Sequence, residues 1–224
     1  MNDECNSQFS ILNSQLILST AYFAPILYYS CLLAKDANVI IERHENFNKQ
    51  SYRNRCTIYT ANGLLDLIVP VVKSKNPKIP ITEVEISYDT DWQKQHFRAI
   101  EAAYSRSPFY QFFIDELMLF FNIRHRYLYD FNMQILQTIC RLMKLPMHIT
   151  ESAHYIKPET EGIIDLRNRI HPKIAPHQAV PNFAAPRYTQ VFADKWGFKA
   201  NLSILDLLFN NYSIPLVGRH SPYD

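Results

Sequence analysis

The chain has 224 residues, a length that suits one large domain or one domain with an appendage. Its apolar fraction of 47% predicts a substantial core, and its formal net charge of +2 is too small for broad nucleic-acid binding. With only 4 glycines, and neither a Gly-rich dinucleotide fingerprint nor a P-loop motif, the sequence argues against both common phosphate-binding loops.

Cysteine spacing and hydropathy indicate which metal sites and which cellular location to expect. The 4 cysteines are far apart and form no CxxC pair, so we expect no metal site of the usual zinc spacing. The N-terminus lacks the basic and apolar regions of a signal peptide, and no apolar run reaches the about 18–20 residues of a membrane span. We therefore expect a cytoplasmic protein without a membrane span, and the sequence names no cofactor.

Residues 1–14 are expected to form a flexible leader, and a βαβ unit follows them. Residues 15–20 predict a strand, residues 26–34 a helix entered through Pro25, and residues 39–41 a second strand. The two strands of such a unit are parallel, so their carboxyl ends meet at one edge of the sheet. Ligands in open α/β sheets bind beyond that edge.

A hairpin and a further strand are predicted next. The Asn62-Gly63 pair separates apolar runs at 57–60 and 64–72, a strong signal for two antiparallel strands joined by a tight turn. Alternating polar and apolar residues over 84–88 predict a half-exposed strand. Together with the βαβ unit, these segments predict a mixed sheet in the N-terminal part.

The middle of the chain is predicted to be helical. One helix begins after Asp89, with Thr90 as its N-cap and Gln93, three residues further on, completing a capping box. Two more helices are predicted over 109–121 and 124–145, because apolar residues recur there at helical spacing.

The C-terminal part has a different pattern, because the periodicity fades from 146 to about 190 and prolines interrupt it repeatedly. We predict no regular elements there; a long segment of this kind is often a lid, a clasp or a partner-binding arm. A closing amphipathic helix is predicted over 203–209. The predicted fold class is α/β, with an N-terminal βαβ unit and mixed sheet followed by a mainly helical half, which together form a core over 15–145. A Pro-rich C-terminal arm and the closing helix, residues 146–224, are expected to pack on that core.

One polar stretch, residues 44–56, separates two apolar runs, and nearly every residue in it can hydrogen-bond or carry charge. Forked arginine donors suit a phosphate, a carboxylate or a sugar. Because the stretch follows the second strand of the βαβ unit, it is predicted at the ligand end of the sheet, with the 19–25 turn as its opposite wall. A solvated basic loop, or ion pairs with the local acids, is the alternative. Counted with its flanking residues, the stretch has a net charge of +4 − 2 = +2. The positive charges are Arg43, Lys49, Arg53 and Arg55, and the negative charges are Glu42 and Glu45.

Catalytic and binding roles follow from side-chain chemistry. His44 and His96 are the candidates for general acid–base catalysis, because imidazole titrates near neutral pH, and Glu45 would orient His44 or act alone. A structural role is the alternative for each histidine. For Tyr22 and Tyr104, which are among the predicted binding residues, a position in the core or at the rim of the site is the alternative. The predicted ligand-binding residues are Tyr22, Asn46, Lys49, Tyr52, Arg53, Arg55 and Tyr104.

Four further polar residues have weaker signals. Asn132 interrupts an apolar helical stripe and is predicted to tie two elements together, because a buried amide needs hydrogen-bond partners. His171 and His177 lie six apart without further ligands, which is weak support for a metal site. Cys56 adjoins the basic residues, where a thiol pKa falls, but without a paired base it is a poor candidate nucleophile.

Several segments together resemble a known family. The combination of Lys49-Gln-x-Tyr-Arg-Asn-Arg55 with Trp92-Gln-x-x-His96 is their most distinctive part. In them the chain resembles the WbqC-like protein family, whose name comes from bacterial surface-polysaccharide (O-antigen) gene clusters. The segments are residues 18–29, 44–55, 92–96, 104–109 and 201–209, and the resemblance extends over roughly 15–145 and 195–210.

The resemblance implies a bacterial protein of surface-polysaccharide biosynthesis. The first hypothesis is a transferase that places an acyl or aminoacyl group on a nucleotide-activated amino sugar, with nucleotidyl transfer as a variant. The basic residues would then hold the anionic part of this small-molecule ligand. The alternative is a non-catalytic binding or assembly protein of a polysaccharide pathway, whose basic stretch binds an acidic partner or glycan. Its C-terminal arm would clasp another subunit, for example in a homo-oligomer.

Overall fold

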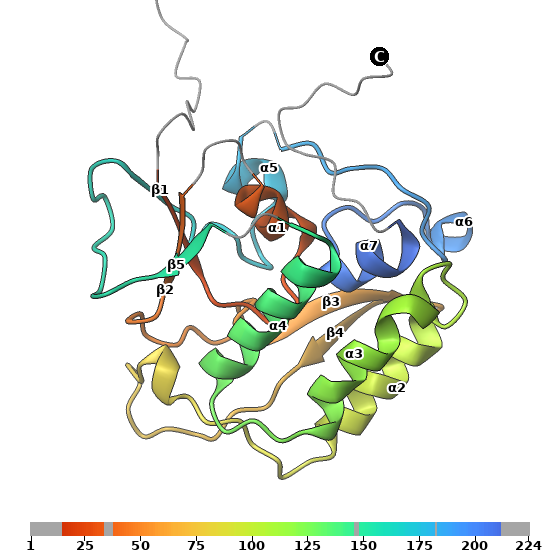
Figure 1. Ribbon diagram of the computed structural model, residues 1–224, viewed down its shortest axis with the longest axis horizontal. Coiled ribbons are helices and arrows are strands. Elements are labelled where there is room, and N and C mark those ends of the chain that lie inside the picture. Colours follow the sequence, from red (N-terminus) through yellow and green to blue (C-terminus); the bar gives the residue numbers. More distant parts are fainter. Residues whose placement is uncertain (1–14, 34–37, 146–147, 182, 212–224) are drawn as a thin grey trace, which may run out of the picture.

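Figure 1 shows the chain as a computed structural model, which describes residues 15–33, 38–145, 148–181 and 183–211. The predicted leader over residues 1–14 lies outside this described part.

The N-terminal βαβ unit is confirmed. Strand β1 (Gln15–Ser19), helix α1 (Ile26–Leu32) and strand β2 (Asn38–Glu42) follow one another, and the two strands pair in parallel with Ser19 opposite Glu42. All of β1 except its first residue is buried, which suits a parallel strand that is covered on both faces. The carboxyl ends of β1 and β2 therefore lie at one edge of the sheet.

Two short strands from the C-terminal part complete the parallel sheet. Strand β5 (Ile149–Glu151) pairs with β2 and strand β6 (Ile163–Asp165) pairs with β1, giving the order β5-β2-β1-β6 with every pair parallel. The prediction of no regular elements from 146 to about 190 is therefore wrong. Each strand has only three residues, too few for a periodic signal, and helix α5 (Pro176–Ala179) is nearly as short. Helix α6 (Ala193–Trp196) follows just beyond.

The predicted hairpin is confirmed as a second, antiparallel sheet. Strand β3 (Arg55–Thr60) pairs with strand β4 (Gly63–Ile68), and the turn between them ends at Gly63 with a φ of 100°. This backbone conformation strains any residue with a Cβ atom, so glycine is the residue that the turn requires.

The strand predicted over 84–88 is wrong. This segment follows a 3-10 turn, η1 (Ile81–Glu83), and forms only isolated bridges. Its backbone bonds to two different neighbours, because Ile86 N donates to Arg126 O and Ser87 N donates to Pro70 O, both at 2.9 Å. A segment divided between two partners cannot build one ladder, although its side chains alternate as they would in a strand.

The predicted helices are confirmed, with shifted ends. They are α2 (Trp92–Tyr104), α3 (Tyr110–Asn122) and α4 (Leu128–Leu142). Helix α4 begins later than the sequence predicts, because Leu128 N donates to Val84 O at 2.9 Å and the residues before it pair with the 84–86 segment. Figure 1 shows α2 and α3 lying side by side.

The predicted capping box at the start of α2 is not formed. The N-cap is Asp91, which makes no side-chain capping bond. Instead, Gln93 Nε2 donates to the carbonyl oxygens of Phe120 and Ile123 at 3.1 and 2.8 Å. Gln93 therefore ties α2 to the end of α3.

The closing helix is confirmed as α7 (Ile204–Asn210), which is buried at every residue and contacts α1, α3 and β3. Its N-cap is Ser203, whose Oγ accepts from Leu205 N at 3.4 Å and donates to Phe23 O at 2.8 Å.

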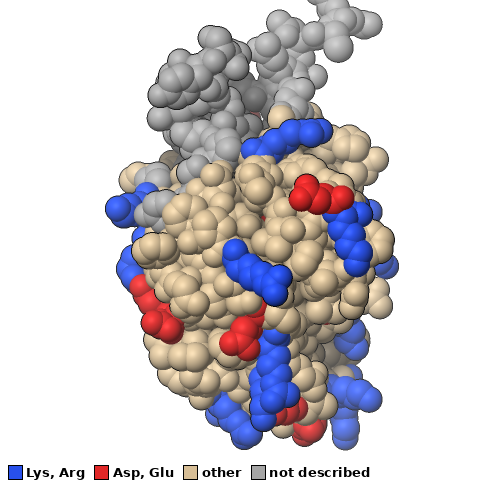
Figure 2. Space-filling model, turned by 90° about the vertical axis from the view of Figure 1, so that its right-hand side faces the viewer, with Lys and Arg blue, Asp and Glu red and all other residues tan. Residues whose placement is uncertain are grey.

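No helix in the described ranges is both long and apolar enough to cross a membrane. On the face shown in Figure 2, Lys and Arg side chains are interspersed with Asp and Glu.

Candidate functional site

The carboxyl ends of β1, β2 and β6 carry polar side chains at the same edge of the sheet. β1 ends at Ser19, β2 at Glu42 and β6 at Asp165, and the polar stretch 44–56 begins two residues after the end of β2. In an open α/β sheet this edge is where ligands bind. The 19–25 turn contacts the polar stretch, since Tyr22 N donates to the carbonyl oxygen of Tyr52 at 2.9 Å, but no residue of the turn lines the pocket described below.

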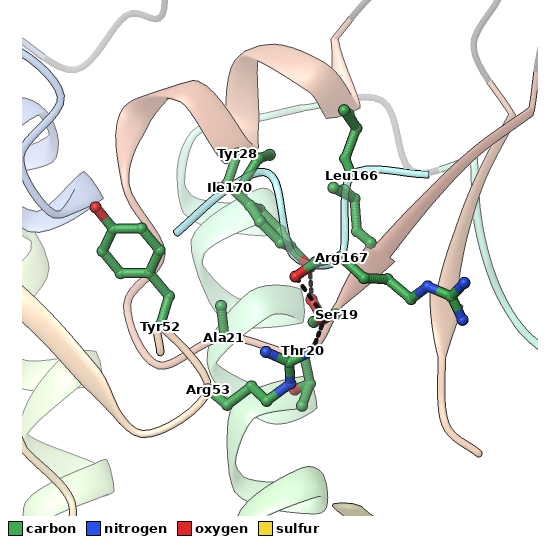
Figure 3. A pocket seen from close by; sticks show the side chains of 10 residues that line it. Ser19, Thr20, Ala21, Tyr28, Tyr52, Arg53, Leu166, Arg167 and Ile170 are labelled. Atoms are coloured by element: carbon green, nitrogen blue, oxygen red, sulfur yellow. Dashed lines mark hydrogen bonds between the residues drawn. The ribbon is translucent and has the colours of Figure 1, made fainter. Parts of the chain in front are cut away.

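Arg53 is the centre of one buried network. Its Nε donates to Glu45 Oε1 at 2.8 Å, and its Nη2 donates to Glu45 Oε2 at 2.5 Å and to Ser19 Oγ at 2.6 Å. The backbone is held as well, because Asn132 Nδ2 donates to Arg53 O at 2.7 Å. Asn132 thus ties α4 to the polar stretch, as predicted. Figure 3 shows Arg53 and Ser19 meeting, with the guanidinium of Arg167 turned away from them.

Glu42 is the centre of a second network. Its Oε1 accepts from Ser152 Oγ at 2.6 Å and from His44 N at 2.8 Å, while its Oε2 accepts from Arg167 Nη1 at 3.1 Å and Ile156 N at 2.9 Å. The carboxylate therefore joins the end of β2 to the segments that follow β5 and β6.

Arg167 also pairs with Asp165, two residues earlier. Its Nε donates to Asp165 Oδ1 at 3.0 Å and its Nη2 donates to Oδ2. Burial alone would raise the pKa of Asp165, but the hydrogen bonds and the charge of Arg167 outweigh it, so the pKa lies below its ordinary value.

The two networks neutralise the arginines at this edge. Glu42, Glu45, Arg53 and Arg167 are each at most 5% exposed. A buried charge of this kind is tolerable only when it is paired and hydrogen-bonded. With Asp165, three carboxylates face two guanidinium groups, so the networks themselves hold no uncompensated positive charge.

A pocket of about 280 Å³ opens over both networks. This volume is near the lower end of the usual range for small-molecule sites, about 300–1,000 Å³, and suits a group the size of one sugar. A small cavity of about 10 Å³ between Ser19, Tyr52 and Arg167 shares Arg53 and Arg167 with this pocket and is too small for a ligand (Figure 3). The polar residues that line the larger pocket are Glu45, Asn46, Asn48, Arg53, Asp165, Arg167 and Asn168, with Tyr155 beside them.

Of the residues predicted to bind a ligand, the structure brings Asn46 and Arg53 together at this pocket, with Glu45 from the catalytic set. Tyr52 lines the small cavity that shares Arg53 with this pocket. Arg55 lies on β3, where its Nη1 contacts Asp66 Oδ2 at 3.3 Å across the hairpin. Residues 51–54 form a turn, so Arg53 and Arg55 do not share one face of an extended chain.

The two predicted histidines lie outside the lining of the pocket. His44 is exposed, directly before Glu45. His96 is buried on α2, with its Nδ1 2.9 Å from the hydroxyl of Tyr22. Burial lowers the pKa of His96 to about 4, so its ring is neutral at pH 7.

Three other predicted groups also lie elsewhere. Tyr104 is fully buried, and its hydroxyl oxygen accepts from Tyr59 N at 3.1 Å. Lys49 is exposed and lines a neighbouring pocket. Cys56 is buried, and burial raises the pKa of its thiol well above the ordinary value, so it is a thiol at neutral pH. In the part of the chain that the structure describes, no three His, Cys, Asp or Glu residues are grouped to hold a metal ion.

The sequence reasoning missed Arg167, Asp165 and the central role of Glu42. Arg167 and Asp165 lie in the segment where the periodicity fades. One signal was available: Ile163-Ile164-Asp165 repeats the pattern of Ile40-Ile41-Glu42, an apolar pair with an acid at the strand end. Both acids lie at the edge where the pocket opens.

The fold and the pocket define an α/β protein with a parallel sheet and a polar pocket beyond its strand ends, whose arginines are all paired with carboxylates. Residues 21–175 match the model of the WbqC-like protein family, which is more than half of the chain. The chain belongs to the WbqC-like protein family. The matched range includes every charged residue of the two networks, Arg167 among them.

A curated relative is similar over most of its length. "Uncharacterized protein Rv1507c" of Mycobacterium tuberculosis (strain ATCC 25618 / H37Rv) is 29% identical over 226 residues, which cover 89% of this chain and 92% of the relative. No solved structure matches the chain.

Proposed function

We propose that this protein is a group transferase of bacterial surface-polysaccharide biosynthesis, and that it places an acyl or aminoacyl group on a nucleotide-activated amino sugar. The observation that carries the proposal is the sugar-sized pocket over the two buried ion networks. A sugar needs donors and acceptors at fixed positions, and the paired side chains around the pocket supply both. Three buried free cysteines, Cys31, Cys56 and Cys140, support a cytoplasmic location.

The amide side chains Asn46, Asn48 and Asn168 suit the hydroxyl groups of a sugar, because each offers one acceptor and two donors. The carboxylates of Glu45 and Asp165 suit its amino group. Both carboxylates are held by arginines, so they stay in place when a ligand enters.

In the transfer step, the amine nitrogen attacks the carbonyl carbon of an acyl donor and forms a C–N bond. The bond from that carbon to the donor's leaving group breaks, and a base takes the proton from the amine. We assign the base to His44, because it is exposed and directly precedes Glu45, which lines the pocket. His96 is less suited, because its ring faces Tyr22 inside the core.

Ligand binding tests the pocket directly. Thermal unfolding would be followed with a nucleotide-linked amino sugar and with the same nucleotide alone, where a ligand at 100 times its Kd adds about 2.7 kcal/mol. We expect a larger stabilisation with the sugar, and we expect Asn168→Phe, which fills the pocket from its exposed rim, to remove the difference. The matched control is Asn122→Phe, an exposed asparagine at the end of α3. Equal stabilisation by both ligands in the wild-type protein would contradict the proposal.

A non-catalytic binding protein is the second candidate. It is favoured by the lining of the pocket, which contains neither His nor Cys among the described residues and whose buried arginines are already paired. The two candidates differ at His44. If His44→Ala leaves surface-glycan assembly unchanged while Asn168→Phe abolishes it, the binding function is correct.

A further inference from the structure

A second pocket, of about 390 Å³, adjoins the first and shares Phe47 and Asn48 with it as lining residues. Its other walls come from the loop at residues 71–79 and from Val84. This loop is fixed against the polar stretch, because Phe47 N donates to Ile79 O at 2.9 Å. The two pockets therefore lie on either side of a single short wall.

The charges of the two pockets differ. The second is lined by Lys49 and Lys73 and by no acidic residue, and Lys75 and Lys78 belong to the same loop. All four lysines are exposed, and in the described part of the chain none of them forms an ion pair. The second pocket thus carries positive charge without an acidic partner among its lining residues.

The loop that carries Lys73, Lys75 and Lys78 has a defined shape. Ser74 Oγ accepts from Asn76 N at 3.0 Å, and Asn76 Oδ1 accepts from Lys78 N at 2.9 Å. These side-chain bonds hold the turn, and buried Val84 lies beneath the pocket. A loop held in this way orders the backbone on either side of its lysines before a ligand arrives, which lowers the entropy cost of binding.

We propose that the second pocket is a phosphate subsite, in which Lys49 and Lys73 bind the phosphate-bearing part of a ligand. Ammonium groups bind phosphate as point charges and need no fixed fork geometry. The identity of the ligand rests on the proposed function: its sugar would lie in the first pocket and its phosphates in the second, with Asn48 in contact with both. The anionic part is then held by lysines, while Arg53 shapes the sugar pocket and Arg55 stays on the hairpin.

Inorganic pyrophosphate is the probe, and isothermal titration calorimetry measures its Kd. We expect the double variant Lys49→Gln/Lys73→Gln to bind pyrophosphate about tenfold or more weakly, because two charge-assisted contacts are lost. The control Lys94→Gln/Lys144→Gln removes the same charge at exposed positions outside both pockets and should retain the wild-type Kd. Asn168→Phe should also retain it.

The subsite is overturned if wild-type protein does not bind pyrophosphate, if Lys49→Gln/Lys73→Gln binds it as tightly as wild type, or if the control loses as much affinity. The proposed function fails separately. If pyrophosphate binds through Lys49 and Lys73 but the sugar adds nothing to binding in wild type, the subsite stands and the sugar-transfer role does not.

Discussion

The protein buries carboxyl groups in two different surroundings. At the edge of the sheet, Glu42 and Glu45 each contact an arginine, at 3.1 and 2.5 Å. On α7, Asp206 is 1% exposed and accepts instead from the neutral Tyr188 hydroxyl at 2.5 Å and from Gln190 Nε2 at 3.0 Å. The first surrounding compensates the charge with an opposite charge; the second offers only dipoles.

Two buried groups of the core, Asp206 and His96, have shifted pKa values. Burial raises the pKa of Asp206 to about 6, although hydrogen bonds from Tyr188, Tyr104 and Gln190 act in the opposite direction. Burial has the corresponding effect on a basic group at His96, where it lowers the pKa to about 4. Both of these groups lie in the core and have no ion-pair partner in the described part of the chain.

The largest expected effect comes from breaking a compensated pair. Arg53→Ala leaves Glu45 buried without its cation, and we expect the free energy of unfolding to fall by about 3–5 kcal/mol. Urea unfolding at pH 7 measures the change. In the double variant Arg53→Ala/Glu45→Gln no charge is left uncompensated, so part of the loss should be recovered. A loss no larger in Arg53→Ala than in the double variant would contradict this account.

The acid sensitivity of His96 is the next expectation. The pKa of His96 in the folded state is below its unfolded value of 6.5. Its contribution to the free energy of unfolding is therefore present above pH 6.5 and is lost as pH falls through about 4. This loss is roughly 3 kcal/mol. His96→Gln should remove this loss in urea unfolding between pH 4 and 7. Tyr22→Phe removes the hydroxyl next to the ring but keeps the site buried, so the acid sensitivity should persist. Its disappearance in Tyr22→Phe would show that the hydrogen bond, and not burial, is the cause.

Asp206 should have an opposing effect of similar or slightly smaller size. The pKa of Asp206 in the folded state is raised above 3.8. Its contribution to the free energy of unfolding is therefore fully present below pH 3.8 and is lost as pH rises through about 6. This loss is again roughly 3 kcal/mol. In wild type the contributions of Asp206 and His96 oppose one another between pH 4 and 6. Asp206→Asn should expose the acid sensitivity of His96, so that the free energy of unfolding rises more steeply with pH. An unchanged slope would mean that Asp206 does not titrate in this window.

The smallest expected effect is at an exposed pair of the same chemistry. Arg55 contacts Asp66 at 3.3 Å, with side chains 21% and 43% exposed. Arg55→Ala should cost about 0–1 kcal/mol, and less as salt is added. Urea unfolding at low and high salt tests it. A loss of stability as large as that of Arg53→Ala would mean that burial does not determine how much these ion pairs contribute to the free energy of unfolding.

Most of the fold could be predicted because its signals are local. Apolar spacing indicated α2, α3 and α4, and the Asn62-Gly63 turn indicated the hairpin. β5 and β6 were not predicted from periodicity, because three residues give no period and their pairing depends on strands far away in sequence. The capping box failed because Gln93 found tertiary partners on α3 that the local motif does not include.

The candidate site was predicted in place but not in detail. The polar stretch lies at the sheet edge as expected, because strand order in a βαβ unit follows from chirality and connection length. Whether Arg53 binds a ligand or a carboxylate depends on Glu45 and Ser19 converging in space, which sequence adjacency does not reveal. Arg167 was missed for a related reason: its partner Glu42 is 125 residues away.

The position of β6 has a consequence for synthesis of the chain. β1 and β2 leave the ribosome early, but the open edge of β1 and the buried carboxylate of Glu42 are completed only by β6 and Arg167. Until then the nascent chain carries an unpaired strand edge and an acid without its cation, which favours wrong association. The pocket is thus among the last parts to assemble, and a fragment ending before residue 163 would lack it although it contains the whole polar stretch.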